Sequence, residues 1–160
     1  MTTKHQEMQR LIRHYKDVTG KTDINMHEVA QFAVDKGWPL PRPIAAIDRL
    51  AKEFSLAARE EVRYDDKTGK PYRANHAVTT VQGSMQMTLW VDIDEAPRGK
   101  ILKSLVQRRE QMVGDGLQLT LDAMHWNSVH PREEPINLPL DFTDDIEWRI
   151  NAPDEEKKVS

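Results

Sequence analysis

The chain has 160 residues, of which 38% are hydrophobic and 31% charged, a composition that allows both a buried core and good solubility. The absence of cysteine excludes disulfides, thiolate metal sites and a cysteine nucleophile. No apolar run approaches the roughly 18 residues of a membrane helix, and Met1–Glu7 lacks the apolar segment of a signal peptide. We therefore expect a soluble, cytoplasmic protein with one domain, or one domain and a small appendage.

The net charge of −3 is unevenly distributed along the chain. Residues 1–75 contain 14 Lys and Arg against 11 Asp and Glu, whereas residues 128–160 contain 4 against 9. This asymmetry is typical of a basic working face followed by an acidic segment, and it is equally typical of ordinary solvated surface. Both interpretations stay open at this point.

Two amphipathic helices are predicted at the start of the chain. Residues 4–18 place apolar side chains three and four positions apart, and Gly20 provides a helix end. A second helix is expected over residues 26–36, with Asp23 or Asn25 as its N-cap.

A longer helix with a basic stripe follows the proline-rich connector Trp38–Pro43. On a helical wheel its cations, from Arg42 onward, fall together opposite an arc of Ile, Leu, Phe and Ala side chains. The next segment, Tyr64–Arg73, has a strand–turn–strand composition with Gly69 at the tip. Three helices followed by a charged hairpin resemble a winged-helix module over about residues 5–80.

The resemblance to a winged helix implies non-catalytic binding of double-stranded DNA, as a regulator or a small accessory protein of a bacterial or mobile-element system. Arg42 and Arg49 would then lie nearest the base edges, and Lys52 and Arg59 would neutralise phosphates. The hairpin cations would reach an adjacent groove or the backbone. Glu53 and Glu60 dilute the stripe, so a solvated helix face with surface salt bridges is the competing interpretation. The predicted DNA-binding residues are Arg42, Arg49, Lys52, Arg59, Arg63, Lys67, Lys70 and Arg73.

A second hairpin is predicted around Gln82-Gly83. Between residues 85 and 94, apolar and polar side chains alternate with a period of two, which indicates a strand with one buried face. An amphipathic helix is expected over residues 98–113, with Gly114-Asp-Gly116 as its interruption or kink. Residues 117–126 fit either a strand or a helix, and we favour the helix because residues 123–126 continue without a break.

These elements define an α+β fold. The predicted organisation is a helical, winged-helix-like module over residues 1–80, a hairpin packed on one or two helices over residues 81–150, and a flexible acidic tail over residues 151–160. The first two parts form either separate modules or one domain. Residues 136–140 fit a short strand.

Asp92 and Asp94 lie on one face at the end of the second predicted hairpin. Two carboxylates spaced in this way bind a hard divalent cation such as Mg²⁺. The hydrophobic–Asp–hydrophobic–Asp pattern resembles the metal motif of archaeal–eukaryotic-type primase-polymerases, in which Ser128–His130 would match the Ser-x-His motif and Asp141 the third carboxylate. The resemblance implies a Mg-dependent nucleotidyl-transfer or nuclease enzyme, whereas the simpler interpretation is two carboxylates on an exposed strand face.

Other residues form weaker candidates for metal-binding or catalytic sites. Asp122, His125 and His130 are close in the sequence, but the spacing of the two histidines does not align them on a helix as zinc ligands. The sequence contains no phosphate-loop, dinucleotide-binding or nucleophile-elbow motif. We therefore expect neither enzymatic activity nor a cofactor.

The tryptophans favour an alternative function. Three of the four lie beyond residue 89, and aromatic anchors are common in protein–protein interfaces. Trp126 and Trp148 are the predicted partner-binding residues of a protein–protein adaptor or inhibitor that docks through its acidic C-terminal third. A homodimer held by attraction between the basic and acidic parts is a further prediction, and no membrane partner is expected.

Overall fold

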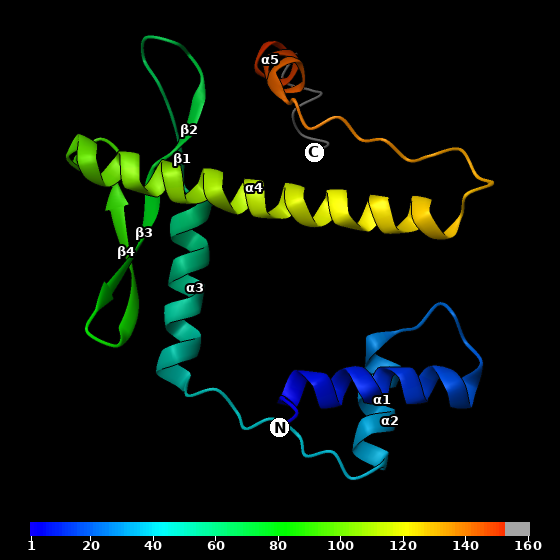
Figure 1. The fold of residues 1–160 in the computed structure, drawn as a ribbon. Helices are drawn as coiled ribbons and strands as arrows, with labels where there is room; N and C mark the ends of the chain where they lie inside the picture. Colours follow the sequence, from blue (N-terminus) through cyan, green and yellow to red (C-terminus); the bar gives the residue numbers. More distant parts are fainter. Residues whose placement is uncertain (153–160) are drawn as a thin grey trace. The chain divides into compact units, whose positions relative to one another are not determined.

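The computed structural model describes residues 1–152, which form five α-helices and two antiparallel two-stranded sheets (Figure 1). The predicted α+β class is confirmed. The chain divides into two compact units, Met1–Arg49 and Leu50–Ser160. The division lies inside the third helix, well before residue 80, because the end of that helix bonds to the second hairpin. The predicted tail, 151–160, lies outside the described residues except for its first two positions.

The first unit consists of α1 (Lys4–Thr19) and α2 (Met26–Asp35), which pack against each other. α1 ends at Gly20, whose φ of 69° is in the left-handed region that glycine tolerates. The side chain of Asn25 accepts a hydrogen bond from the His27 N–H and caps α2. The C-terminal end of α1 and the N-terminal end of α2 therefore follow from local sequence signals, as predicted.

The core of this unit forms around Tyr15. Its ring lies 5.3 Å from the Phe32 ring, edge to face. Its hydroxyl donates to a Glu28 carboxylate oxygen at 3.0 Å, and Lys21 donates to the same oxygen at 3.1 Å. These two bonds lower the pKa of Glu28, with Lys21 as the larger cause.

Helix α3 (Ala46–Glu60) is shorter than the predicted basic helix. Arg42 precedes it in the connector, and Arg63 follows it in a strand. Proline at position 43 disfavours helical backbone before it, and β-branched Val62 favours strand. The predicted stripe is therefore not carried by one helix, and the cations that α3 does carry are Arg49, Lys52 and Arg59.

The first hairpin pairs β1 (Val62–Tyr64) with β2 (Pro71–Arg73). Gly69 adopts a φ of 68° in the connecting loop, as its predicted place at the tip requires. The Asp65 side chain accepts the backbone N–H groups of Lys67 and Thr68 at 2.8 and 2.9 Å, which stabilises the loop and lowers the pKa of Asp65.

The second hairpin pairs β3 (Asn75–Gln82) with β4 (Met85–Asp92), in register from Asn75↔Asp92 to Gln82↔Met85. Its two-residue turn is Gly83-Ser84, with Gly83 at a φ of 61°. The predicted hairpin is confirmed, with its turn one residue later than predicted. The predicted buried face of its second strand is wrong, because Met85, Met87 and Leu89 are exposed.

Helix α4 (Arg98–Val129) runs for 32 residues without a break. The predicted interruption at Gly114-Asp-Gly116 is wrong, and the ambiguous residues 117–126 are helical. A glycine costs a helix only about 1 kcal/mol relative to alanine, and the Leu, Gln and Met residues around these two glycines favour helix.

After α4, residues 136–140 are extended but belong to no strand, contrary to the prediction. The Asn127 side chain of α4 bonds both the N–H and the C=O of Ile136, at 2.8 and 2.9 Å, so a side chain replaces the pairing strand. The unpredicted helix α5 (Thr143–Asn151) follows, and the Asp141 carboxylate accepts the N–H and the hydroxyl of Thr143 before it. None of the helices within residues 1–152 combines the length and the apolar character that a bilayer crossing requires.

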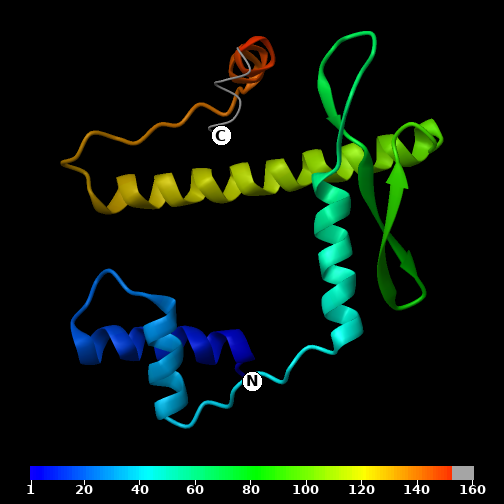
Figure 2. The ribbon, with the colours of Figure 1, turned by 180° about the vertical axis from the view of Figure 1, so that it is seen from behind.

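The second unit is assembled around the contact between α4 and β3, which Figure 2 shows from behind. The fully buried Ser104 hydroxyl donates to the Ala77 carbonyl at 2.6 Å. Val78 and His76 are also buried here. At the end of α3, the Asn75 side chain donates to the Ala58 carbonyl at 3.0 Å, which ties α3 to the same hairpin.

Gly114→Ala is expected to stabilise the second unit by about 0.5–1 kcal/mol, because alanine loses less backbone entropy in a helix. The substitution has room, since no atom lies within 4 Å of the added Cβ. Gly83→Ala is the matched control and should destabilise the protein, because φ is positive there. Thermal unfolding of the three proteins measures both effects, and a lower melting temperature for Gly114→Ala would contradict the continuous helix.

Candidate nucleic-acid interface

The cations of α3 are exposed, but one of them already has a structural contact. The Arg59 guanidinium lies over the Trp90 ring of β4, 5.6 Å from its centroid, in a cation–π arrangement. Arg49 and Lys52 lie one turn apart, and Glu53 follows them directly. Arg42 and Arg49 belong to the first unit, whereas the hairpin cations belong to the second.

Arg63 of β1 is held by two carboxylates. Its guanidinium donates to both oxygens of Asp92, at 2.9 and 2.7 Å, and to Asp94 at 2.8 Å. The Tyr72 hydroxyl donates to Asp94 at 2.9 Å. Hydrogen bonds from Arg63 lower the pKa of Asp92, and the bond to Asp94 raises the pKa of Tyr72. The structure thus uses Arg63 to join the two hairpins.

This ion pair also occupies Asp92 and Asp94, the predicted ligands of a divalent cation. A cation bound to both carboxylates competes directly with a divalent metal for the same oxygens. Asp141, the third carboxylate of the primase-like pattern, accepts hydrogen bonds from Thr143. Within residues 1–152, no group of three or more His, Asp or Glu side chains is arranged to hold a metal ion.

A basic pocket of about 420 Å³ lies between the first hairpin and α4. It contains one predicted cation, Arg73 of β2, and one that sequence reasoning missed, Arg108 of α4. Neither has a carboxylate within 4.0 Å among the described residues. The lining residues are Val62, Pro71, Tyr72, Arg73, His76, Ile93 and Arg108.

The wall of the basic pocket is fixed by His76. The imidazole is buried, and its Nε2 lies 2.9 Å from the Arg73 carbonyl oxygen. Because a carbonyl only accepts hydrogen bonds, Nε2 must carry a proton and donate it. The backbone of Arg73 is thereby held while its side chain stays exposed to solvent.

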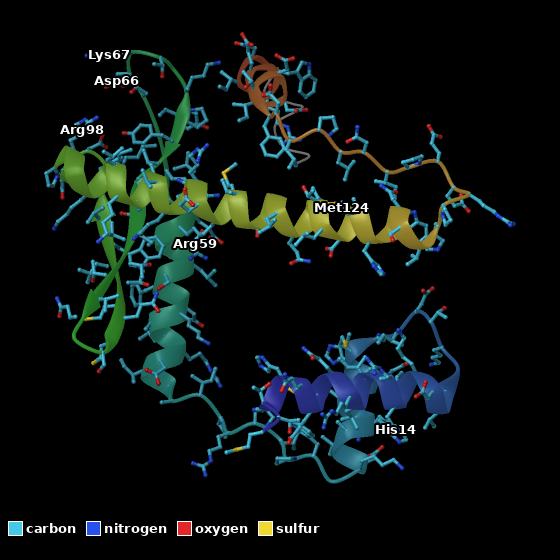
Figure 3. The ribbon with its side chains drawn as sticks, viewed as in Figure 1. His14, Arg59, Asp66, Lys67, Arg98 and Met124 are labelled. Carbon is cyan, nitrogen blue, oxygen red and sulfur yellow. The ribbon has the colours of Figure 1, made fainter. Side chains whose placement is uncertain are left out.

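The hairpin tip carries the last predicted cations. Figure 3 shows Lys67 beside Asp66 in the loop between β1 and β2, and Arg98 at the start of α4. Lys67 is exposed and, within residues 1–152, pairs with no carboxylate. Lys70 donates instead to the Ile150 carbonyl of α5 at 2.8 Å.

Arg108 belongs to a basic stretch that the sequence did display. Residues 98–109, the first third of α4, contain five Lys and Arg and no Asp or Glu. Cations at a helix N-terminus oppose the helix dipole, so this arrangement does not serve the stability of α4 itself. This concentration of cations at the start of the helix was the sequence feature from which a basic site could have been predicted.

The predicted partner-binding residues lie on separate helices. Trp126 is near the end of α4, where its ring stacks on His130 at a centroid distance of 3.6 Å. Trp148 is on α5 and is 64% exposed. No hydrogen bond or ring contact joins the two tryptophans in the part of the chain that the structure describes.

Comparison with protein-family models, with curated proteins and with solved structures gives no match for this chain. The function therefore has to be inferred from its own residues.

Arg63→Gln is expected to lower stability at neutral pH. Because the folded-state pKa of Asp92 is below its unfolded value of about 3.9, the stabilisation is present above that pH and is lost as the pH falls through the folded value. The urea midpoints of wild type and Arg63→Gln should therefore differ at pH 7 and converge in acid. Arg98→Gln is the control, and a difference independent of pH would contradict the role of the ion pair.

Proposed function

We propose that this protein binds double-stranded DNA without catalysing a reaction on it. The observation that carries the proposal is the basic pocket, where Arg73 of β2 and Arg108 of α4 approach the same space without carboxylate partners in the described residues. Two arginines that line one shallow pocket favour an anion with several oxygens, because a guanidinium offers a planar fork of N–H donors.

A phosphate of a nucleic-acid backbone suits this pocket. The Tyr72 ring contributes an apolar wall, and its hydroxyl is already bonded to Asp94, so the free donors come from the arginines. Phosphate contacts by Arg and Lys supply most of the non-specific affinity for DNA. The pocket would then bind the phosphate backbone of the DNA without distinguishing base sequences.

Further cations near the anchor support a binding surface larger than one phosphate. Lys67 lies in the loop of the hairpin that carries Arg73, and Arg98, Lys100 and Lys103 lie on the helix that carries Arg108. The winged-helix resemblance assigns the hairpin the part of a wing that grips a duplex. In the same comparison, Arg49 and Lys52 on α3 are the residues that would contact the groove.

Protein–protein docking is the second candidate, and exposed aromatic residues favour it. Trp148 is largely exposed on α5, whose first turn contains Asp144 and Asp145. An acidic helix with an aromatic anchor fits a basic, grooved partner. An adaptor of this kind should lose its partner on Trp148→Ala and should bind DNA weakly or not at all.

The test of DNA binding is fluorescence anisotropy of a labelled random duplex. With four phosphates neutralised, affinity should fall about 100-fold between 50 and 200 mM salt. Arg73→Glu/Arg108→Glu should abolish binding. The control, Lys4→Glu/Lys16→Glu, changes the net charge equally on exposed positions of α1 and should bind nearly as wild type.

Circular dichroism of both double variants checks that they are folded. Flat anisotropy with wild type at tens of micromolar and low salt would overturn the proposal. Equal weakening by the pocket variant and its control would leave only a general charge effect and would also reject the pocket as the anchor.

A further inference from the structure

Side chains of α4 bond the outer edge of strand β3 at Ala77 and Thr79. The Gln107 side chain accepts the Thr79 N–H at 3.1 Å and donates to the Thr79 C=O at 3.0 Å. Two residues earlier, the Ala77 carbonyl accepts from Ser104. These bonds show that the backbone groups of Ala77 and Thr79 point away from β4.

The outer edge of β4 has no such bonds among the described residues. Thr88 lies opposite Thr79 and Trp90 lies opposite Ala77 in the register. In an antiparallel pair, opposite residues point their backbone groups both toward or both away from each other. The N–H and C=O of Thr88 and Trp90 therefore face outward, and within residues 1–152 no hydrogen bond reaches them.

The sequence of β4 does not protect this edge. Met85–Val91 contains no Pro, Gly or charged residue, although these are the usual devices that prevent an edge strand from pairing with another chain. The strand is eight residues long, and its first five residues are exposed. Because α4 covers β3 at Ala77 and Thr79, the outer edge of β4 is the more accessible edge of this sheet.

We propose that β4 pairs antiparallel with β4 of a second copy of this chain, about a two-fold axis at Thr88. The pairing forms a four-stranded sheet in the order β3, β4, β4, β3. Thr88 then exchanges both backbone hydrogen bonds with the partner's Thr88, and Gln86 and Trp90 extend the ladder on either side. About six hydrogen bonds result from these three pairs.

The side chains of β4 are self-complementary in this register. On one face Met87 lies opposite Leu89, and Met85 lies opposite Val91, so every pair is apolar. On the other face Gln86 lies opposite Trp90, and no charged pair arises. Asp92, the one charged residue of β4, is already bonded to Arg63.

The apolar face of β4 is exposed. Met85 is 65% exposed, Leu89 44% and Met87 36%. Two copies of this row become neighbours on one face of the proposed sheet. The interface is thus a continuation of the existing hairpin, and it does not depend on the proposed binding of DNA.

The first test uses proline at the proposed axis. The Thr88 N–H points outward, so Thr88→Pro removes no bond of the β3–β4 hairpin, and an edge strand tolerates proline there. Light scattering at about 100 μM should give twice the chain mass of 18.5 kDa for wild type and for the control Thr88→Val. Thr88→Pro should give the chain mass with unchanged circular dichroism.

The second test uses charge at the axis. Thr88→Glu and Thr88→Lys each place like charges opposite each other and should both be monomeric. An equimolar mixture should restore the dimer, because position 88 of one copy faces position 88 of the other. A monomeric wild type, a dimer that survives Thr88→Pro, or two charge variants that do not combine would overturn the proposal.

Discussion

The contact between α4 and β3 fixes the position of the long helix on the second hairpin. Gln107 satisfies the backbone of Thr79, and buried Ser104 satisfies that of Ala77, so the helix replaces a strand along this edge. A buried backbone group without a partner would cost more than a typical hydrogen bond contributes. The helix is therefore held at a defined height along the strand. Arg108, the residue after Gln107, reaches the basic pocket for this reason.

A second constraint, the guanidinium of Arg63, joins the hairpins to each other. A planar fork between Asp92 and Asp94 fixes β1 beside the end of β4, and Tyr72 supports one of the carboxylates. The same bonds engage three residues to which the sequence analysis assigned other roles. Arg63 was a predicted DNA-binding residue, and Asp92 and Asp94 were predicted metal ligands. A charge that is held in a structural ion pair is a poor phosphate ligand, and its carboxylates are poor metal ligands.

The sequence predicted the features that depend on neighbouring residues. Gly20, Asn25 and Gly69 have strong local preferences. The alternation of residues 85–94 correctly predicted a strand, although the apolar face of that strand is exposed and not buried as expected. The partners of Arg63 lie about thirty residues away in the sequence. Arg73 and Arg108 come to line one pocket only when the chain folds. No local sequence pattern could therefore predict either pair. The low helix propensity of Gly114 and Gly116 predicted an interruption of the helix. Two glycines cost little free energy in comparison with the other interactions of a 32-residue helix, so the helix continues through them.

An isolated two-stranded hairpin is only marginally stable in water and gains stability from a third strand or from packing on a helix. Here α4 supplies packing at the end of the hairpin where His76 and Val78 are buried, and burial decreases toward the turn at Gly83. Pairing through β4 would supply the missing strands along the exposed half. It would also place two basic pockets on one molecule, and two linked anchors on a duplex bind more tightly than either alone. The open strand edge and the basic pocket are separate observations, but both come from the same α4–β3 contact, which covers one edge at Ala77 and Thr79, positions Arg108 and leaves the other edge free.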